Sequence, residues 1–286
     1  MSRLVIYYNS THAPLISIAS TPLTHVILAF LVPGTTDPTR IEASGNLASV
    51  WPDVPALQAA GKKVMISFGG GTISHQAYQQ LSADVPGLAR QIADFVTERD
   101  LDGVDIDFED TAGFERGAAY DGVAFLTSLT RELAAALPAG RQLISHAPQP
   151  PYLSPSFEGG PYLKVLREAG DAISWINLQF YNNPGFQDPG QITGLPGKPF
   201  VSSVTGLAQG AGGVTWPVAK TVIGKPVAQV DAHTGYLPVA DLVQQVVAPL
   251  VERYGKEVGG VQFAGLEIGL GFLDVGCRHA RRRGRG

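Results

Sequence analysis

The chain has 286 residues, 44% of them hydrophobic, which is enough to form a sizeable core in one large domain or two small ones. A formal net charge of −4 argues against a nucleic-acid partner, and no apolar run approaches the roughly 20 residues that span a membrane. The single cysteine, Cys277, excludes an intrachain disulfide.

The amino-terminal sequence lacks the features of a signal peptide. Met1 leads almost directly into an apolar run, without the basic region, longer apolar stretch and cleavage site that secretion requires. We therefore expect a cytoplasmic protein as the sequence stands, or a secreted one if the chain begins at a mature end.

Eight apolar, β-rich runs recur along the chain, and each is expected to form a strand. They span residues 4–8, 24–31, 63–68, 103–108, 142–147, 174–181, 221–228 and 259–264. Segments with helical periodicity separate several of the strands, at residues 54–61, 86–99, 120–137, 161–169 and 238–254. The helical signal is weak after the first and the sixth strand.

This alternation of strands and helices predicts a parallel sheet, because parallel strands need a crossover connection. Eight such units in about 250 residues have the size of a (β/α)8 TIM barrel. A doubly wound open sheet is the alternative, and the lack of a glycine-rich phosphate loop after the first strand disfavours it. We expect one α/β domain over residues 1–276. Residues 277–286 contain five arginines and are expected to form a basic, disordered tail.

The fourth expected strand carries three acids on one face. Asp105, Asp107 and Glu109 alternate with apolar residues, so their side chains point the same way. Three carboxylates this close repel one another and are costly to bury, which indicates a chemical role. Glu109 is nearest the carboxyl end of the strand, where barrels of this type hold their catalytic groups. Solvated acids, or acids that bind a hard cation such as magnesium, are the alternatives.

The sequence around these acids carries a family resemblance. Residues 102–109, Asp-Gly-Val-Asp-Ile-Asp-Phe-Glu, resemble the glycoside hydrolase family 18 signature Asp-Gly-x-Asp-x-Asp-x-Glu. Residues 4–8, 27–31, 64–71 and 147–149 resemble other strands of that family in the same order, and residues 179–184 resemble the sixth strand of hevamine-type class III chitinases. The resemblance extends from about residue 4 to residue 264 and implies the same barrel.

The resemblance also implies a retaining mechanism in which the substrate's own N-acetyl group is the nucleophile. By that resemblance Glu109 is the general acid and then the base, and Asp107 orients the acetamido group and stabilises the oxazolinium intermediate. Asp105 would tune Asp107, and Tyr181 would donate a hydrogen bond to the acetamido carbonyl. Fixed charges and donors of this kind stabilise charge best where water is excluded.

Substrate contacts are expected at six further positions: Tyr7, Phe30, Gly70, Gln179, Asn182 and Phe263. Tyr7 and Phe30 match aromatic floor positions, although an aromatic residue in a strand is more often core. Gly70 could equally serve a structural turn. The family commonly has a tryptophan at the end of strand eight, where this chain has Ala264, and Phe263 is expected to replace it by a small register shift.

Tryptophan and histidine are two further residue types that could indicate a binding site. Trp51 and Trp175 are expected to pack, whereas Trp216 and His146 are open between packing and the pocket. No pair of histidines has the spacing of metal ligands on one element, so no zinc site and no cofactor are expected.

The expected activity is endo-hydrolysis of β-1,4 N-acetylglucosaminyl bonds in chitin, by a monomer that acts on chitin or another oligosaccharide of N-acetylglucosamine. Two alternatives stay open at this point. One is an endo-β-N-acetylglucosaminidase that cuts the chitobiose core of N-glycans, and the other is a non-catalytic chitin-binding lectin on the same fold.

Overall fold

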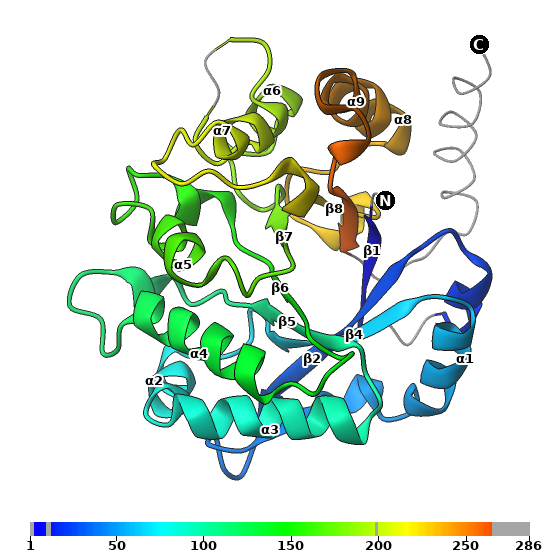
Figure 1. Cartoon of the computed structure of the whole chain (residues 1–286), viewed down its shortest axis with the longest axis vertical. Coiled ribbons are helices and arrows are strands. Elements are labelled where there is room, and N and C mark those ends of the chain that lie inside the picture. Colours follow the sequence, from blue (N-terminus) through cyan, green and yellow to red (C-terminus); the bar gives the residue numbers. More distant parts are fainter. Residues whose placement is uncertain (1–2, 10–12, 198–199, 265–286) are drawn as a thin grey trace.

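A computed structural model of the protein describes residues 3–9, 13–197 and 200–264. Eight parallel strands close into a barrel with helices on the outside (Figure 1). The strands are β1 (Arg3–Tyr8), β2 (His25–Pro33), β4 (Lys63–Gly69), β5 (Gly103–Asp107), β6 (Leu143–His146), β7 (Trp175–Gln179), β8 (Thr221–Pro226) and β9 (Gly260–Ala264). Because β1 pairs with both β2 and β9, the sheet has no open edge there. The single (β/α)8 TIM barrel expected from the sequence is confirmed.

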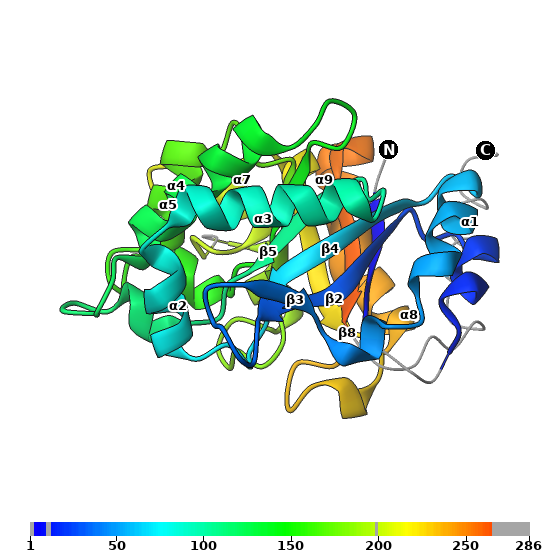
Figure 2. The ribbon, with the colours of Figure 1, turned by 90° about the horizontal axis from the view of Figure 1, so that it is seen from below.

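The helices cover the outer face of the strands. They are α1 (Val54–Ala59), α2 (His75–Ser82), α3 (Val85–Glu98), α4 (Gly122–Ala136), α5 (Pro161–Ala169), α6 (Pro189–Thr193), α7 (Val204–Ala208), α8 (Val239–Leu242) and α9 (Ala248–Tyr254). Helices α3, α4 and α5 lie side by side (Figure 1), and α3 crosses over β4 and β5 (Figure 2). Within the described residues, no helix is long and apolar enough to cross a membrane.

The sequence explains the best-predicted helix, α3. Asp84 caps its first turn by accepting a hydrogen bond from the backbone of Gly87, and Pro86 fits that turn. Apolar residues at helical spacing then form one buried face from Leu88 to Val96. The expected helix at 238–254 is divided in the structure, because a π-helical turn, Val243–Val247, joins α8 to α9.

The barrel separates two cores. The larger core lies between strands and helices and includes Val104, Ile106 and Phe108, the apolar residues that alternate with the three acids. The smaller core lies inside the barrel and includes Val5, Trp175 and residues of other strands. Strand residues therefore alternate between the helical layer and the barrel interior.

The three tryptophans and His146 are all packing residues, as expected for Trp51 and Trp175, whereas the sequence alone leaves Trp216 and His146 open. Trp175 lies inside the barrel with the Arg3 guanidinium 4.7 Å from its ring centroid, and Trp51 packs edge-on against Phe95. Trp216 is buried, with its Nε1 donating to the Lys220 carbonyl. His146 is also buried, with its ring nitrogens 3.1 Å from Thr130 Oγ1 and 3.0 Å from Tyr162 OH.

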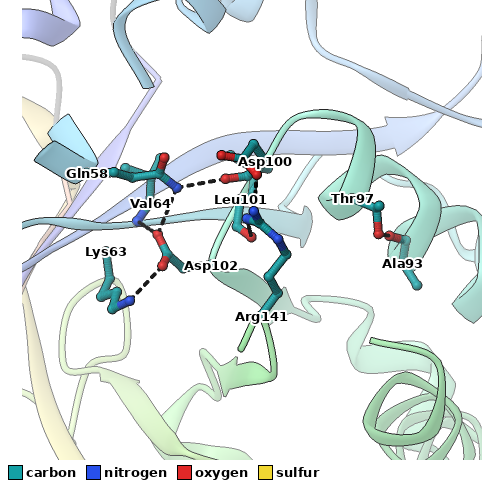
Figure 3. A network of polar contacts seen from close by, with 9 residues as sticks. All are labelled: Gln58, Lys63, Val64, Ala93, Thr97, Asp100, Leu101, Asp102 and Arg141. Carbon is teal, nitrogen blue, oxygen red and sulfur yellow. Dashed lines mark hydrogen bonds and ion pairs between the residues drawn. The ribbon is translucent and has the colours of Figure 1, made fainter. Parts of the chain in front are cut away.

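Asp102, the first acid of the signature run, lies at the opposite end of β5 from Glu109 and braces the barrel (Figure 3). Its carboxylate accepts hydrogen bonds from Lys63 Nζ at 2.7 Å, Val64 N at 2.9 Å and Gln58 Nε2 at 3.2 Å. These bonds connect the starts of β4 and β5 with α1. The run thus combines a structural acid at one end with the three inward acids toward the other.

Candidate active site

Strand β5 delivers the acids to the barrel interior in order of depth. Asp105 is 0% exposed and Asp107 is 4% exposed, while Glu109 is half-buried two residues beyond the end of the strand. The period of two predicted this shared face, and closure of the barrel turned it inward.

Asp105 is held by hydrogen bonds from four other strands. Its carboxylate accepts from Tyr7 OH at 2.5 Å, Ser145 Oγ at 2.6 Å, Ser67 Oγ at 2.8 Å and Asn177 Nδ2 at 3.3 Å. Burial raises the pKa of Asp105 to about 6, and the hydrogen bonds oppose part of that effect. Sequence reasoning missed Ser145 and Asn177 as donors, although both alternate inward on their strands.

This raised pKa predicts how stability depends on pH. The folded-state pKa near 6 exceeds the unfolded value of 3.8, so the folded protein binds more protons between those values. The contribution of Asp105 to the free energy of unfolding is therefore present below about pH 4 and lost as pH rises through about 6, by about 3 kcal/mol. Urea denaturation from pH 4 to 8 of the wild type and Asp105→Asn measures it. The free energy of unfolding of the wild type, relative to that of Asp105→Asn, should fall as pH rises from 4 to 8. A difference between the two proteins that stays constant with pH would contradict the raised pKa of Asp105.

The carboxyl groups of Asp107 and Glu109 share a hydrogen bond and lie beside Gln179. Gln179 Nε2 donates to Asp107 Oδ1 at 2.8 Å and to the Ala147 carbonyl at 2.8 Å. Burial raises the pKa of both acids, and for Asp107 the charge of Glu109 and a hydrogen bond between the two carboxyls raise it further, well above its usual range. The pair can therefore hold a proton near neutral pH, as a general acid must.

The residue after Glu109 fixes the loop that follows β5. Asp110 Oδ2 accepts a hydrogen bond from Tyr120 OH at 2.5 Å and lies 2.8 Å from His75 Nδ1. Both partners come from the helical layer, one from α2 and one from the segment before α4. The backbone that carries Glu109 is thus anchored to the helical layer.

The segment after β7 brings Tyr181 over the acids. Asn183 Nδ2 donates to the carbonyls of Gln179 and Tyr181, and the buried Lys225 donates from Nζ to the Phe180 carbonyl at 2.8 Å. The Tyr181 hydroxyl forms no hydrogen bond within the described part of the chain. Burial raises its pKa well above the usual range, so it stays protonated as a donor.

Asn182 connects two loops at the rim. Its Oδ1 accepts hydrogen bonds from the backbone of His233 at 2.8 Å and Thr234 at 3.3 Å. Its carbonyl oxygen is therefore engaged in the protein, and the amide nitrogen is the group left for a substrate.

A cavity of about 300 Å³ opens above the acid pair. Seven of the residues that line it are expected site residues: Tyr7, Phe30, Asp107, Glu109, Gln179, Tyr181 and Asn182. Gly70 leaves room for the Phe30 ring at the cavity, because a Cβ at this position would lie 3.1 Å from that ring. The site thus combines a proton-holding acid pair, aromatic faces and amide donors. Within the described residues, no cluster of three or more histidine, cysteine, aspartate or glutamate side chains could hold a metal ion.

The structure corrects the expectation for Phe263. Its side chain lies in the core between strands and helices, while its neighbours Gln262 and Ala264 face the cavity. A strand turns successive side chains to opposite faces, so Phe263 cannot reach the cavity while Ala264 lines it. Gln262 was not among the site residues expected from the sequence, although the alternation of faces along the strand could have identified it.

Comparisons with known proteins agree on one family. Residues 3–229 match the family described as Glycosyl hydrolases family 18. The crystal structure of a GH18 chitinase from Pseudoalteromonas aurantia is similar to this chain, with a TM-score of 0.88 and 36% identity over 97% of this chain and 99% of that one. A chitinase from Aspergillus fumigatus, with a TM-score of 0.66 and 22% identity over 98% and 100% of the chains, shows the same fold.

Among curated proteins, endochitinase A from Aspergillus niger is 29% identical over 230 residues. That alignment covers 73% of this chain but only 16% of the fungal protein, so the chain spans a small part of that relative's length.

Proposed function

The chain belongs to glycosyl hydrolases family 18, and from that premise we propose that it hydrolyses β-1,4 bonds beside N-acetylglucosamine in chitin, as an endo-acting enzyme. The observation that carries the proposal is the buried pair Asp107 and Glu109 at the cavity, with Tyr181 beside it. The similarity to endochitinase A from Aspergillus niger supports the choice of substrate.

In the first step Glu109 donates its proton to the glycosidic oxygen as the bond from that oxygen to the anomeric carbon breaks. The carbonyl oxygen of the substrate's acetamido group forms the new bond to the anomeric carbon, which gives an oxazolinium ion. Asp107 faces the acetamido N–H and offsets the positive charge, and the Tyr181 hydroxyl donates to the acetamido oxygen.

In the second step Glu109, now a carboxylate, removes a proton from water. The water oxygen bonds to the anomeric carbon and the acetamido oxygen leaves, so the configuration is retained and Glu109 regains its proton. Asp105 lies one layer deeper on the same strand, and its charge helps to raise the pKa of Asp107.

The test is to incubate the protein with N-acetylglucosamine oligomers and, separately, with a high-mannose glycopeptide. We expect cleavage of the oligomers, with the β-anomer appearing first when followed by NMR, because a retaining enzyme releases that anomer from a β-linked substrate. Cleavage of the glycopeptide alone would replace chitin by the N-glycan core. Binding of oligomers without cleavage of either substrate would make the protein a lectin and overturn the proposal.

A further inference from the structure

Gln262 is a buried polar side chain whose amide lacks a partner. The residue is 1% exposed and lines the cavity from strand β9, yet its Nε2 has no hydrogen-bond partner among the described residues. The other two amides in the barrel interior are bonded, Asn177 to Asp105 and Gln179 to Asp107. Buried polar groups are nearly always paired, so an unpaired amide at a cavity points to a group that binds a ligand.

Two neighbouring positions make room for the Gln262 side chain at the cavity wall. A Cβ at Gly224, on the adjacent strand, would lie 2.6 Å from Gln262 Oε1, so glycine makes the room that the side chain occupies. Ala264 lies two residues nearer the mouth on the same face and lines the cavity with only a methyl group. Gln262 also lies in the same layer as Gln179, since both strands pair with β8 at Gly224.

The charge of the site favours an amide over other donors. A lysine or arginine near Asp107 and Glu109 would favour their ionised forms and lower their pKa. A neutral amide can donate a hydrogen bond to a ligand without removing the proton that the pair holds. The oxygens of a sugar are neutral acceptors, which match such a donor.

We propose that Gln262 is a substrate-binding residue whose amide N–H donates a hydrogen bond to an oxygen of the N-acetylhexosamine held against Asp107 and Glu109. This inference rests on the proposed function and adds to it a contact on the strand-β9 side of the cavity. In the free protein the unpaired amide lowers stability, and the bound sugar supplies the missing acceptor.

The test is Gln262→Met, which keeps the volume and removes the donor. We expect the KM for N-acetylglucosamine oligomers to rise about 5- to 10-fold with kcat changed less than about 2-fold, as loss of one hydrogen bond in ground and transition state predicts. In a Glu109→Gln background the Kd should rise by the same factor. The Tm should increase, since an unpaired buried amide is replaced by an apolar group.

The matched control is Thr205→Val in α7. Thr205 is 1% exposed and its Oγ1 also has no partner among the described residues, but it does not line the cavity. This variant should raise the Tm and leave KM unchanged.

Three results would overturn the inference. An unchanged KM in Gln262→Met with a higher Tm would mean that the amide contributes neither to substrate binding nor to stability. An unchanged KM with a lower Tm would mean that the amide has a structural role. If Gln262→Met and Gln262→Leu both fail to fold, the amide is also structural. In contrast, a wild-type protein that neither cleaves nor binds any oligomer would refute the proposed function itself.

Discussion

Glu109→Gln is expected to abolish hydrolysis and to leave oligosaccharide binding largely intact. Glutamine keeps the size of the side chain but has no proton to give to the glycosidic oxygen and cannot activate water. General acid–base catalysis contributes about 10²- to 10⁴-fold, and here one residue serves both steps, so kcat should fall by about 10³-fold or more. Initial rates on N-acetylglucosamine oligomers measure the loss, and calorimetry measures the Kd.

The control for this variant is Glu98→Gln, which makes the same chemical change on the exposed face of α3. It should leave kcat and Kd at the wild-type values. If Glu109→Gln keeps a tenth of the wild-type rate, Glu109 is not the general acid.

Asp107→Asn is expected to lower kcat by about 10²- to 10³-fold with a much smaller effect on KM. Asparagine has nearly the same shape, but it carries no charge to offset the oxazolinium ion and cannot share a proton with Glu109. Removal of one electrostatic contact made in the transition state typically costs such a factor. Steady-state kinetics on N-acetylglucosamine oligomers separates kcat from KM.

Asp105→Asn provides the graded comparison, because it makes the same change on the same face of β5, one layer deeper. Asp105 does not line the cavity, so its replacement should cost less in kcat than the replacement of Asp107. Equal losses at the two positions would contradict the separate roles that we assign to them.

The barrel and the acidic face could be predicted because both depend on local patterns. Parallel strands buried on both faces appear as continuous apolar runs, and all eight were visible. The shared face of Asp105, Asp107 and Glu109 followed from a period of two within a single run. The short elements lacked such a pattern: α7 has five residues, and β3 (Ile41–Ala43), which pairs antiparallel with β2, has three.

The supporting residues of the site could not be predicted from local patterns. Ser145 and Asn177 lie 40 and 72 residues from Asp105 in the sequence, and only closure of the barrel brings them together. The error at Phe263 has a similar origin. In a strand of five residues, Gly260–Ala264, a shift of one position exchanges the two faces, and the sequence alone does not fix the register.

Closure between β1 and β9 has a consequence for how the protein is made on the ribosome. Tyr7 belongs to β1 and Gln262 to β9, and both line the cavity, so a nascent chain cannot complete this cavity until residue 264 has emerged. Until then β1 and β8 each lack a neighbour that they have in the finished barrel, and such exposed edges are prone to pair with other chains. Synthesis must therefore pass residue 264 before the cavity is complete, and the risk of aggregation is highest just before that point.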